Sequence, residues 1–362
     1  MKAIVNINLD NKTEIPDENI ANYNYYTKGD EVEIVDIVNG ESVAGNKVWY
    51  KLDNGKYIWS GGVEGMNDLS LDNDYKIFNA NDNYWLKDYN IPELWASGLT
   101  GKGVKVAVLD SGLSLPHRNL IDNQIIWKDL SSSDKPGVHD ITGHGTHCAG
   151  IIKASDNGYG IKGLAYECKL YFGKIKNDEL GDSLKRLKFG LNWAISEGVD
   201  LISVSMGRIT DAENLGIVLK EAVSKNIIPV CAGGNKILNV TNDNDILYPA
   251  KYQDCISVGA VDKDKKPSVD TLTSSSLTIG APGTGIKSTF LNNSYKELTG
   301  TSQAAPYVCG VLALIIQYCK EQNIAYSINS MKDWLKLTSD KSVNAPFPVI
   351  NPEKLLNHLK TI

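Results

Sequence analysis

The chain has 362 residues, of which 42% are hydrophobic and 22% are charged, close to the usual values for soluble globular proteins. This length exceeds what one compact core usually organises, so we expect a large and a small domain. The net charge is only -6 and basic residues are spread along the chain, which argues against a nucleic-acid partner.

The chain start, MKAIVNINLD, is interrupted by polar residues and lacks the apolar stretch of a secretory signal. The longest apolar run, residues 311–319, is shorter than the roughly 20 residues of a membrane span, so we expect a buried helix there. We therefore expect a cytoplasmic chain without a membrane partner. The cysteines have irregular spacings and no CxxC pair, which predicts reduced, buried thiols at positions 148, 168, 231, 255, 309 and 319.

The N-terminal part contains three strand-like segments, at residues 31–38, 47–53 and 56–63. Asn54-Gly55 is a hairpin-turn signal between the last two. The segments GDEVEIVD and WYKLDNGKYIWSGGV resemble bacterial SH3-like domains, which implies an all-β domain over residues 1–66 that binds a peptide or a regulatory partner. The Asn- and Asp-rich residues 67–84 predict a linker, which leaves residues 85–362 as the second domain.

From Lys105 onward, short apolar segments alternate with amphipathic ones. This alternation predicts an α/β fold, with a doubly wound parallel sheet and helices on both faces. Catalytic groups gather at the carboxyl ends of the strands in such a sheet. The expected strands are residues 105–110, 169–175, 201–206, 227–234 and 255–261, and the expected helices are residues 182–198 and 212–226.

Two candidate catalytic residues occur in the first part of this region. Asp110 ends the apolar strand KVAVLD, although a turn aspartate that caps the next segment is the alternative. His144 stands in GHGTHCAGIIK, where flanking glycines precede an apolar helix, so it should project from the helix start or act as a polar cap. His147 follows three residues later, but a zinc-protease helix needs the second histidine four residues on and a glutamate beside the first. The sequence therefore disfavours a zinc site.

Ser302 lies in LTGTSQAAPYVCGVLALII, between a glycine turn and a strongly apolar helix. We expect Pro306 in the first turn of this helix, where a missing N–H costs no hydrogen bond. The Ser302 hydroxyl would then lie at a helix N-terminus, where the dipole and free N–H groups favour a developing anion. An ordinary N-cap serine is the alternative.

The segments DSG, HGTHCAG and GTSQAAPYVCG together resemble the three signatures of the subtilisin family, in the family's own order. This resemblance runs from about residue 84 to the C-terminal helices and implies a serine endopeptidase that acts on proteins or peptides without a catalytic cofactor. It implies that Ser302 is the nucleophile, that His144 is its general base, and that Asp110 fixes the imidazole tautomer.

The same resemblance implies the remaining parts of the site. Asn235 stands where the family keeps its oxyanion-stabilising amide, although a turn asparagine is the alternative. Gln303 and Tyr307 depart from the family pattern, and we expect them to reshape the pocket. The substrate backbone should pair with a strand edge, and the implied substrate-binding residues are Ser205, Met206, Gly207, Ala232, Gly233, Gly234 and Thr301.

Two further features concern charge and metal binding. Arg208 and Lys236 lie near the implied pocket, which predicts a preference for acidic residues before the cleaved bond. Residues 155–163, SDNGYGIKG, resemble the family's calcium-binding loop, with Asn157 as the implied side-chain ligand of a structural calcium ion. Calcium usually takes a carboxylate as well. Asn119 stands where the family has that carboxylate, which weakens the expected site.

Two other functions stay open at this point. A catalytically inactive member of this fold would be a peptide-binding module, although all the required side chains are present. Cysteine hydrolase chemistry is disfavoured, because we see no cysteine on the motif pattern beside an available histidine.

Overall fold

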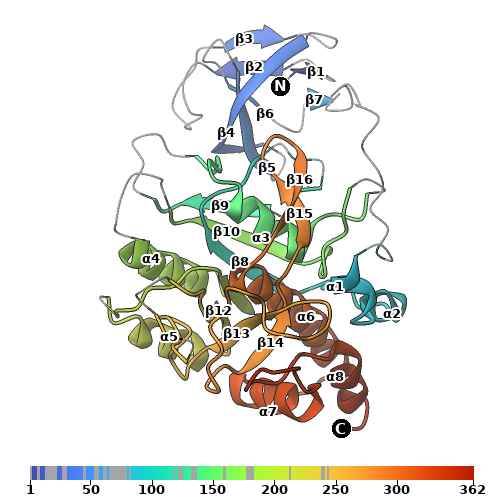
Figure 1. Cartoon of the computed structure of the whole chain (residues 1–362). Coiled ribbons are helices and arrows are strands. Elements are labelled where there is room, and N and C mark those ends of the chain that lie inside the picture. The colour runs from blue at the N-terminus through green and yellow to red at the C-terminus, as the bar shows by residue number, and fades with distance from the viewer. Residues whose placement is uncertain are drawn as a thin grey trace.

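The computed structural model describes residues 80, 83–115, 117, 119–120, 125–131, 137–157, 160–176, 183–211, 213–237, 241–242 and 244–362. Between residues 2 and 64 it describes the backbone of the strands. Figure 1 shows the chain with its helices and strands labelled.

The described backbone of the N-terminal part consists of antiparallel strands, in the order β3-β2-β6-β5-β4-β1-β7. Strands are present at the three predicted segments, but an SH3-like domain stays a prediction. The turn at residues 54–55 and most of the linker at residues 67–84 lie outside the described residues. The strands are β1 (Lys2–Val5), β2 (Leu9–Lys12), β3 (Tyr23–Tyr26), β4 (Glu31–Val43), β5 (Asn46–Leu52), β6 (Tyr57–Trp59) and β7 (Val63–Glu64).

A seven-stranded parallel sheet, in the order β14-β13-β12-β11-β8-β10-β9, forms the centre of the larger described part. Its inner strands are buried on both faces, which explains why their sequences are nearly all apolar. The predicted parallel α/β sheet is confirmed. The strands are β8 (Lys105–Asp110), β9 (Ile125–Asp129), β10 (Lys169–Lys174), β11 (Leu201–Val204), β12 (Ile228–Ala232), β13 (Ile256–Val261) and β14 (Ile279–Pro282).

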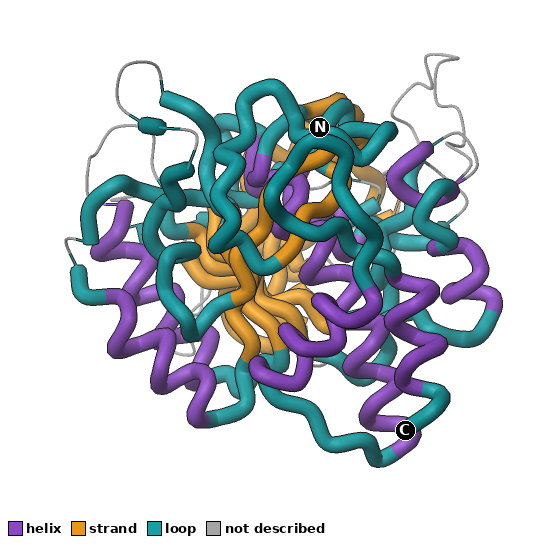
Figure 2. The backbone as a smooth tube through the Cα atoms, turned by 60° about the horizontal axis from the view of Figure 1, so that its bottom comes forward, coloured by secondary structure: helices purple, strands orange, loops and turns teal. Residues whose placement is uncertain are grey.

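Helices lie on both sides of the strands (Figure 2). α3 and α6 pack on one face of the sheet, and α4 and α5 pack on the other. In α4, the leucines at positions 184, 187 and 191 are buried, as their helical spacing predicts. The helices are α1 (Tyr84–Lys87), α2 (Ile91–Ala96), α3 (His144–Lys153), α4 (Ser183–Ser196), α5 (Leu215–Ser224), α6 (Thr301–Gln322), α7 (Ile328–Thr338) and α8 (Pro352–Leu359).

The long helix α6 is the central element of one face. By length and composition alone it could cross a membrane, but 89% of its apolar window is buried inside the fold. It is therefore a core helix, as predicted for residues 311–319. Tyr307 of α6 is fully buried and packs edge to face against Trp85 and Tyr89. The expectation that Tyr307 reshapes the pocket is wrong, because its ring fills the core next to α1.

His147 connects α3 to the hairpin of β15 (Ile286–Phe290) and β16 (Ser294–Leu298). Its buried Nε2 lies 2.9 Å from the carbonyl oxygen of Ile286 and 3.0 Å from that of Lys296. Because both partners are acceptors, Nε2 carries the proton and donates to them. His147 therefore has a structural role in tying the helix to the hairpin.

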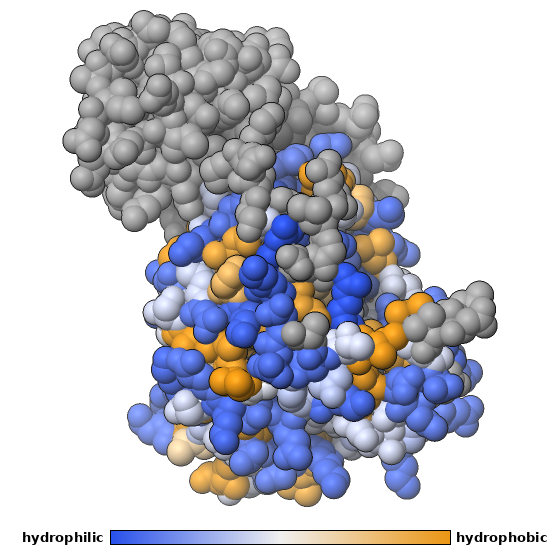
Figure 3. Space-filling view, turned by 90° about the vertical axis from the view of Figure 1, so that its left-hand side faces the viewer, coloured by the Kyte–Doolittle hydropathy of each residue, from blue (hydrophilic) through white to orange (hydrophobic). Residues whose placement is uncertain are grey.

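All six cysteines are buried and none forms a disulfide, which confirms the prediction of reduced, buried thiols. On the face shown in Figure 3, hydrophilic residues prevail and hydrophobic ones form small separate groups. The most exposed large apolar side chains, those of Val269 and Ile217, are single residues of a kind found on most soluble proteins.

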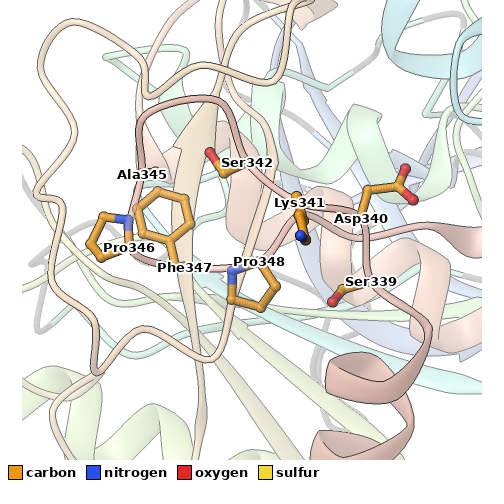
Figure 4. A pocket seen from close by; sticks show the side chains of 8 residues that line it. All are labelled: Ser339, Asp340, Lys341, Ser342, Ala345, Pro346, Phe347 and Pro348. Carbon is orange, nitrogen blue, oxygen red and sulfur yellow. The ribbon is translucent and has the colours of Figure 1, made fainter.

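A pocket of about 350 Å³ lies after α7, where the chain bridges to β14 (Figure 4). Its carboxylate, Asp340, is paired with Lys265 at 2.6 Å and with Lys354 at 2.7 Å. β14 is an edge strand, four positions from β8 in the sheet order, so the pocket is remote from Asp110. The lining residues are Ser339, Asp340, Lys341, Ser342, Ala345, Pro346, Phe347 and Pro348.

Candidate active site

Asp110 and His144 form a pair at the carboxyl edge of the sheet, in which Asp110 is buried and His144 is partly exposed. Asp110 is the last residue of β8, and His144 is the first residue of α3. The Asp110 Oδ1 lies 2.7 Å from the His144 Nδ1 and also accepts a hydrogen bond from the Ser111 N–H. This contact holds the imidazole by one nitrogen and directs the other, Nε2, away from the carboxylate.

The two side chains of this pair change each other's pKa. Burial raises the pKa of Asp110, but the His144 charge and two hydrogen bonds outweigh burial and hold that pKa below its usual value. Burial likewise lowers the pKa of His144, but the Asp110 carboxylate and the neighbouring Cys148 together outweigh burial and raise this pKa well above 6.5. His144 keeps 32% of its side chain exposed, whereas Asp110 keeps only 6%. The imidazole of His144 is therefore a stronger base than a free histidine, and it is accessible to solvent.

The carboxylate of Asp140 organises the chain that leads into α3. Its Oδ1 accepts hydrogen bonds from the Ser111 hydroxyl at 2.9 Å and from the Gly143 N–H at 3.0 Å. Its Oδ2 accepts from the backbone N–H and the hydroxyl of Thr146, at 2.9 and 2.7 Å. Asp140 is fully buried. It links the residue after Asp110 to the residues around His144, and so positions the pair.

Ser302 is the second residue of α6 and exchanges two hydrogen bonds with Ser205, which follows β11. The Ser302 hydroxyl donates to the Ser205 carbonyl oxygen at 3.0 Å, and the Ser205 hydroxyl donates to the Ser302 carbonyl oxygen at 2.9 Å. The Ser302 carbonyl is available because Pro306, four residues on, has no N–H to donate. Pro306 is thus the sixth residue of α6, and its predicted place in the first turn is wrong.

Cys148 contacts both His144 and Ser302. It lies one helical turn after His144, with its Sγ 3.9 Å from the His144 Nδ1 and 3.3 Å from the Ser302 carbonyl oxygen. The two residues therefore flank one sulfur atom. The Ser302 hydroxyl points to Ser205 instead of the imidazole, and among the described residues no hydrogen bond joins it to His144.

Asn235 lies on the other side of Ser302, just after β12. Its Oδ1 accepts hydrogen bonds from the backbone N–H and the hydroxyl of Thr301, both at 3.1 Å. Because a backbone N–H can only donate, the Asn235 Oδ1 must face Thr301, and the Nδ2 donor is therefore not used in these two hydrogen bonds. Thr301 itself is buried. The Ser302 N–H makes no backbone hydrogen bond to the described residues, as expected for the second residue of a helix.

The remaining predicted substrate residues follow two neighbouring strands. Ser205, Met206 and Gly207 follow β11, whereas Ala232, Gly233 and Gly234 end or follow β12, which pairs with β11 in parallel. Ser205 contacts Ser302, and the Gly234 N–H donates to the Thr301 hydroxyl at 3.3 Å. Both segments therefore contact the start of α6, and we call them the two walls of the candidate substrate cleft.

The side-chain amide of Asn119 is hydrogen-bonded to the loop that contains the implied calcium ligand, Asn157. The Nδ2 of Asn119 donates to the Ser155 carbonyl at 3.1 Å and to the Asn157 Oδ1 at 3.0 Å. Its Oδ1 accepts from the Ile161 N–H at 3.3 Å, which fixes the orientation of the amide. The Ser155 carbonyl and the Asn157 Oδ1 are thus both hydrogen-bonded to the Asn119 amide, and a calcium ion bound here stays a prediction.

The sequence pattern missed Asp140, the function of Pro306 and, most clearly, Cys148. Cys148 is four residues after His144 within a helix, and residues with this spacing share a helix face. That spacing was the available signal for a thiol beside the imidazole. The premise that no cysteine lies near a histidine is therefore wrong. Burial nevertheless raises the pKa of the Cys148 thiol, which disfavours the thiolate needed for cysteine hydrolase chemistry.

Comparison with protein families finds one match in agreement with this geometry. The model of the subtilase family matches residues 101–351, which contain all the residues discussed at this edge of the sheet. The matched range excludes the N-terminal strands.

Individual relatives agree with the family match. The major intracellular serine protease of Bacillus subtilis (strain 168) is 38% identical over 240 residues, or 65% of this chain and 75% of the relative. The intracellular serine protease of Paenibacillus polymyxa is 36% identical over 62% of this chain and 70% of the relative. Subtilisin DY of Bacillus licheniformis is 34% identical over 63% of this chain and 84% of the relative.

Proposed function

This chain belongs to the subtilase family, and we propose that it cleaves peptide bonds by acyl transfer to Ser302, with His144 as the general base and Asp110 as its orienting carboxylate. The family sets the activity, that of a subtilisin-like serine endopeptidase acting on proteins or peptides. The observation that supports these residue roles is the meeting of the Asp110–His144 pair and Ser302 around Cys148.

The chemistry begins with proton transfer. A serine hydroxyl is a weak nucleophile, so His144 must take its proton through Nε2 as Oγ attacks the carbonyl carbon. The imidazolium is then stabilised by Asp110, which stays ionised. The peptide C–N bond breaks as His144 returns the proton to the leaving amine, and an acyl-enzyme remains. Water, activated by the same imidazole, hydrolyses this ester and restores Ser302.

We assign oxyanion stabilisation to the Asn235 Nδ2 and the Ser302 N–H. The negative charge that develops on the carbonyl oxygen needs donors that are already oriented. Thr301 orients Asn235 through two hydrogen bonds to Oδ1, and the helix N-terminus supplies the second donor. In this assignment Thr301 acts on the substrate through Asn235.

A cleavage assay tests the proposed mechanism. Wild-type chain, Ser302→Ala and His144→Ala are incubated with a denatured protein, and new N-termini are identified by mass spectrometry. We expect internal cleavage by the wild type alone. Folded wild-type protein that binds peptides but produces no new termini would instead support the inactive peptide-binding module.

We propose that the N-terminal strands form an SH3-like domain over residues 1–66, joined by a linker at residues 67–84 to the peptidase at residues 85–362. The described antiparallel strands and the family match that starts at residue 101 support this division. The small domain would bind a peptide or a regulatory partner. Binding of labelled peptides to the full chain, before and after deletion of residues 1–66, tests this function.

We also propose that the protein acts in the cytoplasm. Two of the relatives reported above are named intracellular serine proteases. Six free thiols fit a reducing compartment. Fractionation of the source cells with an antibody to the chain distinguishes a cytoplasmic from an exported protein.

A further inference from the structure

The side chain of Leu247 approaches a glycine in each of the two walls, residues 205–207 and residues 232–234. A Cβ built on Gly207 would lie 2.8 Å from the Leu247 Cβ, and a Cβ built on Gly234 would lie 2.5 Å from the Leu247 Cγ. Both glycines therefore contact the same isobutyl group, one from each wall. Only 5% of Leu247 is exposed, so its side chain fills the inner part of this space.

Backbone hydrogen bonds hold Leu247 in this place. Its N–H donates to the Gly233 carbonyl at 2.9 Å, which ties it to one wall. The next residue, Tyr248, exchanges two hydrogen bonds with Arg208, at 2.8 and 2.9 Å, which ties the segment to the other wall. These bonds fix the backbone of Leu247 beside both walls.

We propose that Leu247 closes the specificity pocket, and that the protease prefers a small side chain on the residue whose carbonyl is attacked. This inference rests on the proposed function, because it takes Ser302 as the nucleophile and Asn235 as an oxyanion donor. With the carbonyl carbon at the Ser302 hydroxyl and its oxygen towards Asn235, the substrate side chain enters between residues 205–207 and 232–234. The glycines provide width there, but Leu247 limits the depth.

The expected discrimination follows from the cost of overpacking. Forcing extra methylene groups into a packed apolar site costs about 1–3 kcal/mol, or roughly 5- to 150-fold in rate. A phenylalanine ring would have to displace Leu247, whereas an alanine methyl group would not. We therefore expect alanine before the cleaved bond to be preferred over phenylalanine by at least about tenfold in kcat/KM.

The charged residues near the pocket predict a different preference for the residue before the cleaved bond. Arg208 and Lys236 favour an acidic residue at the same place, but both are exposed residues, and solvent and salt screen exposed charges. The closed depth of the pocket also excludes the longer glutamate side chain. We expect size to decide the specificity.

The test uses blocked tetrapeptide anilides that differ only in the residue before the cleaved bond, which is Ala, Phe, Glu or Lys. Wild-type chain, Leu247→Gly and Leu247→Ala are compared with Leu277→Ala. Leu277 lies behind one wall, where a Cβ built on Gly233 would be 2.5 Å from its Cδ2, and it is 3% exposed. The control therefore removes the same atoms from a buried leucine outside the proposed pocket.

We expect the wild type and Leu277→Ala to prefer the Ala peptide, and both Leu247 variants to raise the ratio of Phe to Ala cleavage at least tenfold. Two variants are used because Leu247→Gly loses more packing and could unfold, which circular dichroism detects. A wild type that cleaves the Phe or Glu peptide better than the Ala peptide, or an unchanged ratio in folded Leu247→Ala, overturns the assignment of Leu247 alone. Failure to cleave any peptide, without labelling by a fluorophosphonate, overturns the proposed function as well.

Discussion

Pro306 leaves the carbonyl oxygen of Ser302 without a partner inside α6, and the Ser205 hydroxyl occupies that oxygen at 2.9 Å. The same two residues are joined by a second bond, from the Ser302 hydroxyl to the Ser205 carbonyl at 3.0 Å. The proline thus couples the helix that carries the nucleophile to the edge of the cleft. This coupling fixes the backbone at Ser302 and holds its hydroxyl against the Ser205 carbonyl.

Ser205→Ala removes one of these two bonds and keeps the carbonyl that receives the Ser302 hydroxyl. A hydrogen bond of this kind contributes about 1 kcal/mol, so we expect kcat/KM to fall roughly fivefold. Ser203→Ala is the control, because Ser203 is also buried but lies within β11. A loss of about a thousandfold in Ser205→Ala would contradict this supporting role.

The pH dependence should reflect the Asp110–His144 pair. Only neutral His144 can accept the proton of Ser302, so kcat/KM should rise with pH through the pKa of His144, which Asp110 raises above 6.5. The stability that the charged pair contributes is complete between about pH 3.8 and pH 6.5. It is lost as the pH rises through the raised pKa of His144 and as the pH falls through the lowered pKa of Asp110.

Asp110→Asn tests the origin of this shift. Without the carboxylate, burial dominates, and the acid limb of the kcat/KM profile should move below pH 6.5. We expect kcat to fall by about 10⁴-fold, because the amide also favours the wrong imidazole tautomer. An unchanged acid limb in the variant would show that another group controls the profile.

Asn235→Ala should reduce kcat by about 100- to 1000-fold with little change in KM, the loss measured for the oxyanion asparagine of a subtilisin. The variant loses the Nδ2 donor and leaves the Thr301 N–H without its partner. Asn235→Asp keeps an acceptor for Thr301 but offers no donor to the oxyanion. A normal kcat in Asn235→Asp would assign Asn235 to a structural role.

Asn119 should make the fold independent of calcium, because its amide already engages Ser155 and Asn157. We expect excess calcium to change the melting temperature of the wild type little. Asn119→Asp places a carboxylate against the same oxygens, so calcium should raise the melting temperature of that variant by about 5 °C. A calcium-dependent wild type would show instead that the loop rearranges to bind the ion.

Much of this site could be predicted from local patterns. Asp110 ends an apolar strand, and residues after buried parallel strands meet at one edge of the sheet. His144 and Ser302 both stand among glycines at the start of apolar helices. Each of these features depends on residues that are neighbours in the chain, such as a strand end or a helix start. They can therefore be recognised from the sequence without the tertiary structure.

The remaining features depend on contacts between distant segments. Leu247 enters the cleft from a segment with no motif, and only the tertiary structure places it between Gly207 and Gly234. Tyr307 departs from the family pattern near the nucleophile, but its helix turns the ring towards α1. The edge strands β9 and β14 were not predicted, because such short strands carry little periodic signal.

The most direct measurement is labelling of the full chain with a fluorophosphonate probe, followed by peptide mapping, in the wild type, Ser302→Ala and Cys148→Ala. The account predicts one label per chain on Ser302 in the wild type and in Cys148→Ala, and none in Ser302→Ala. Labelling that persists in Ser302→Ala, or folded wild-type protein that takes up no label, would contradict the assignment of Ser302 as the activated nucleophile.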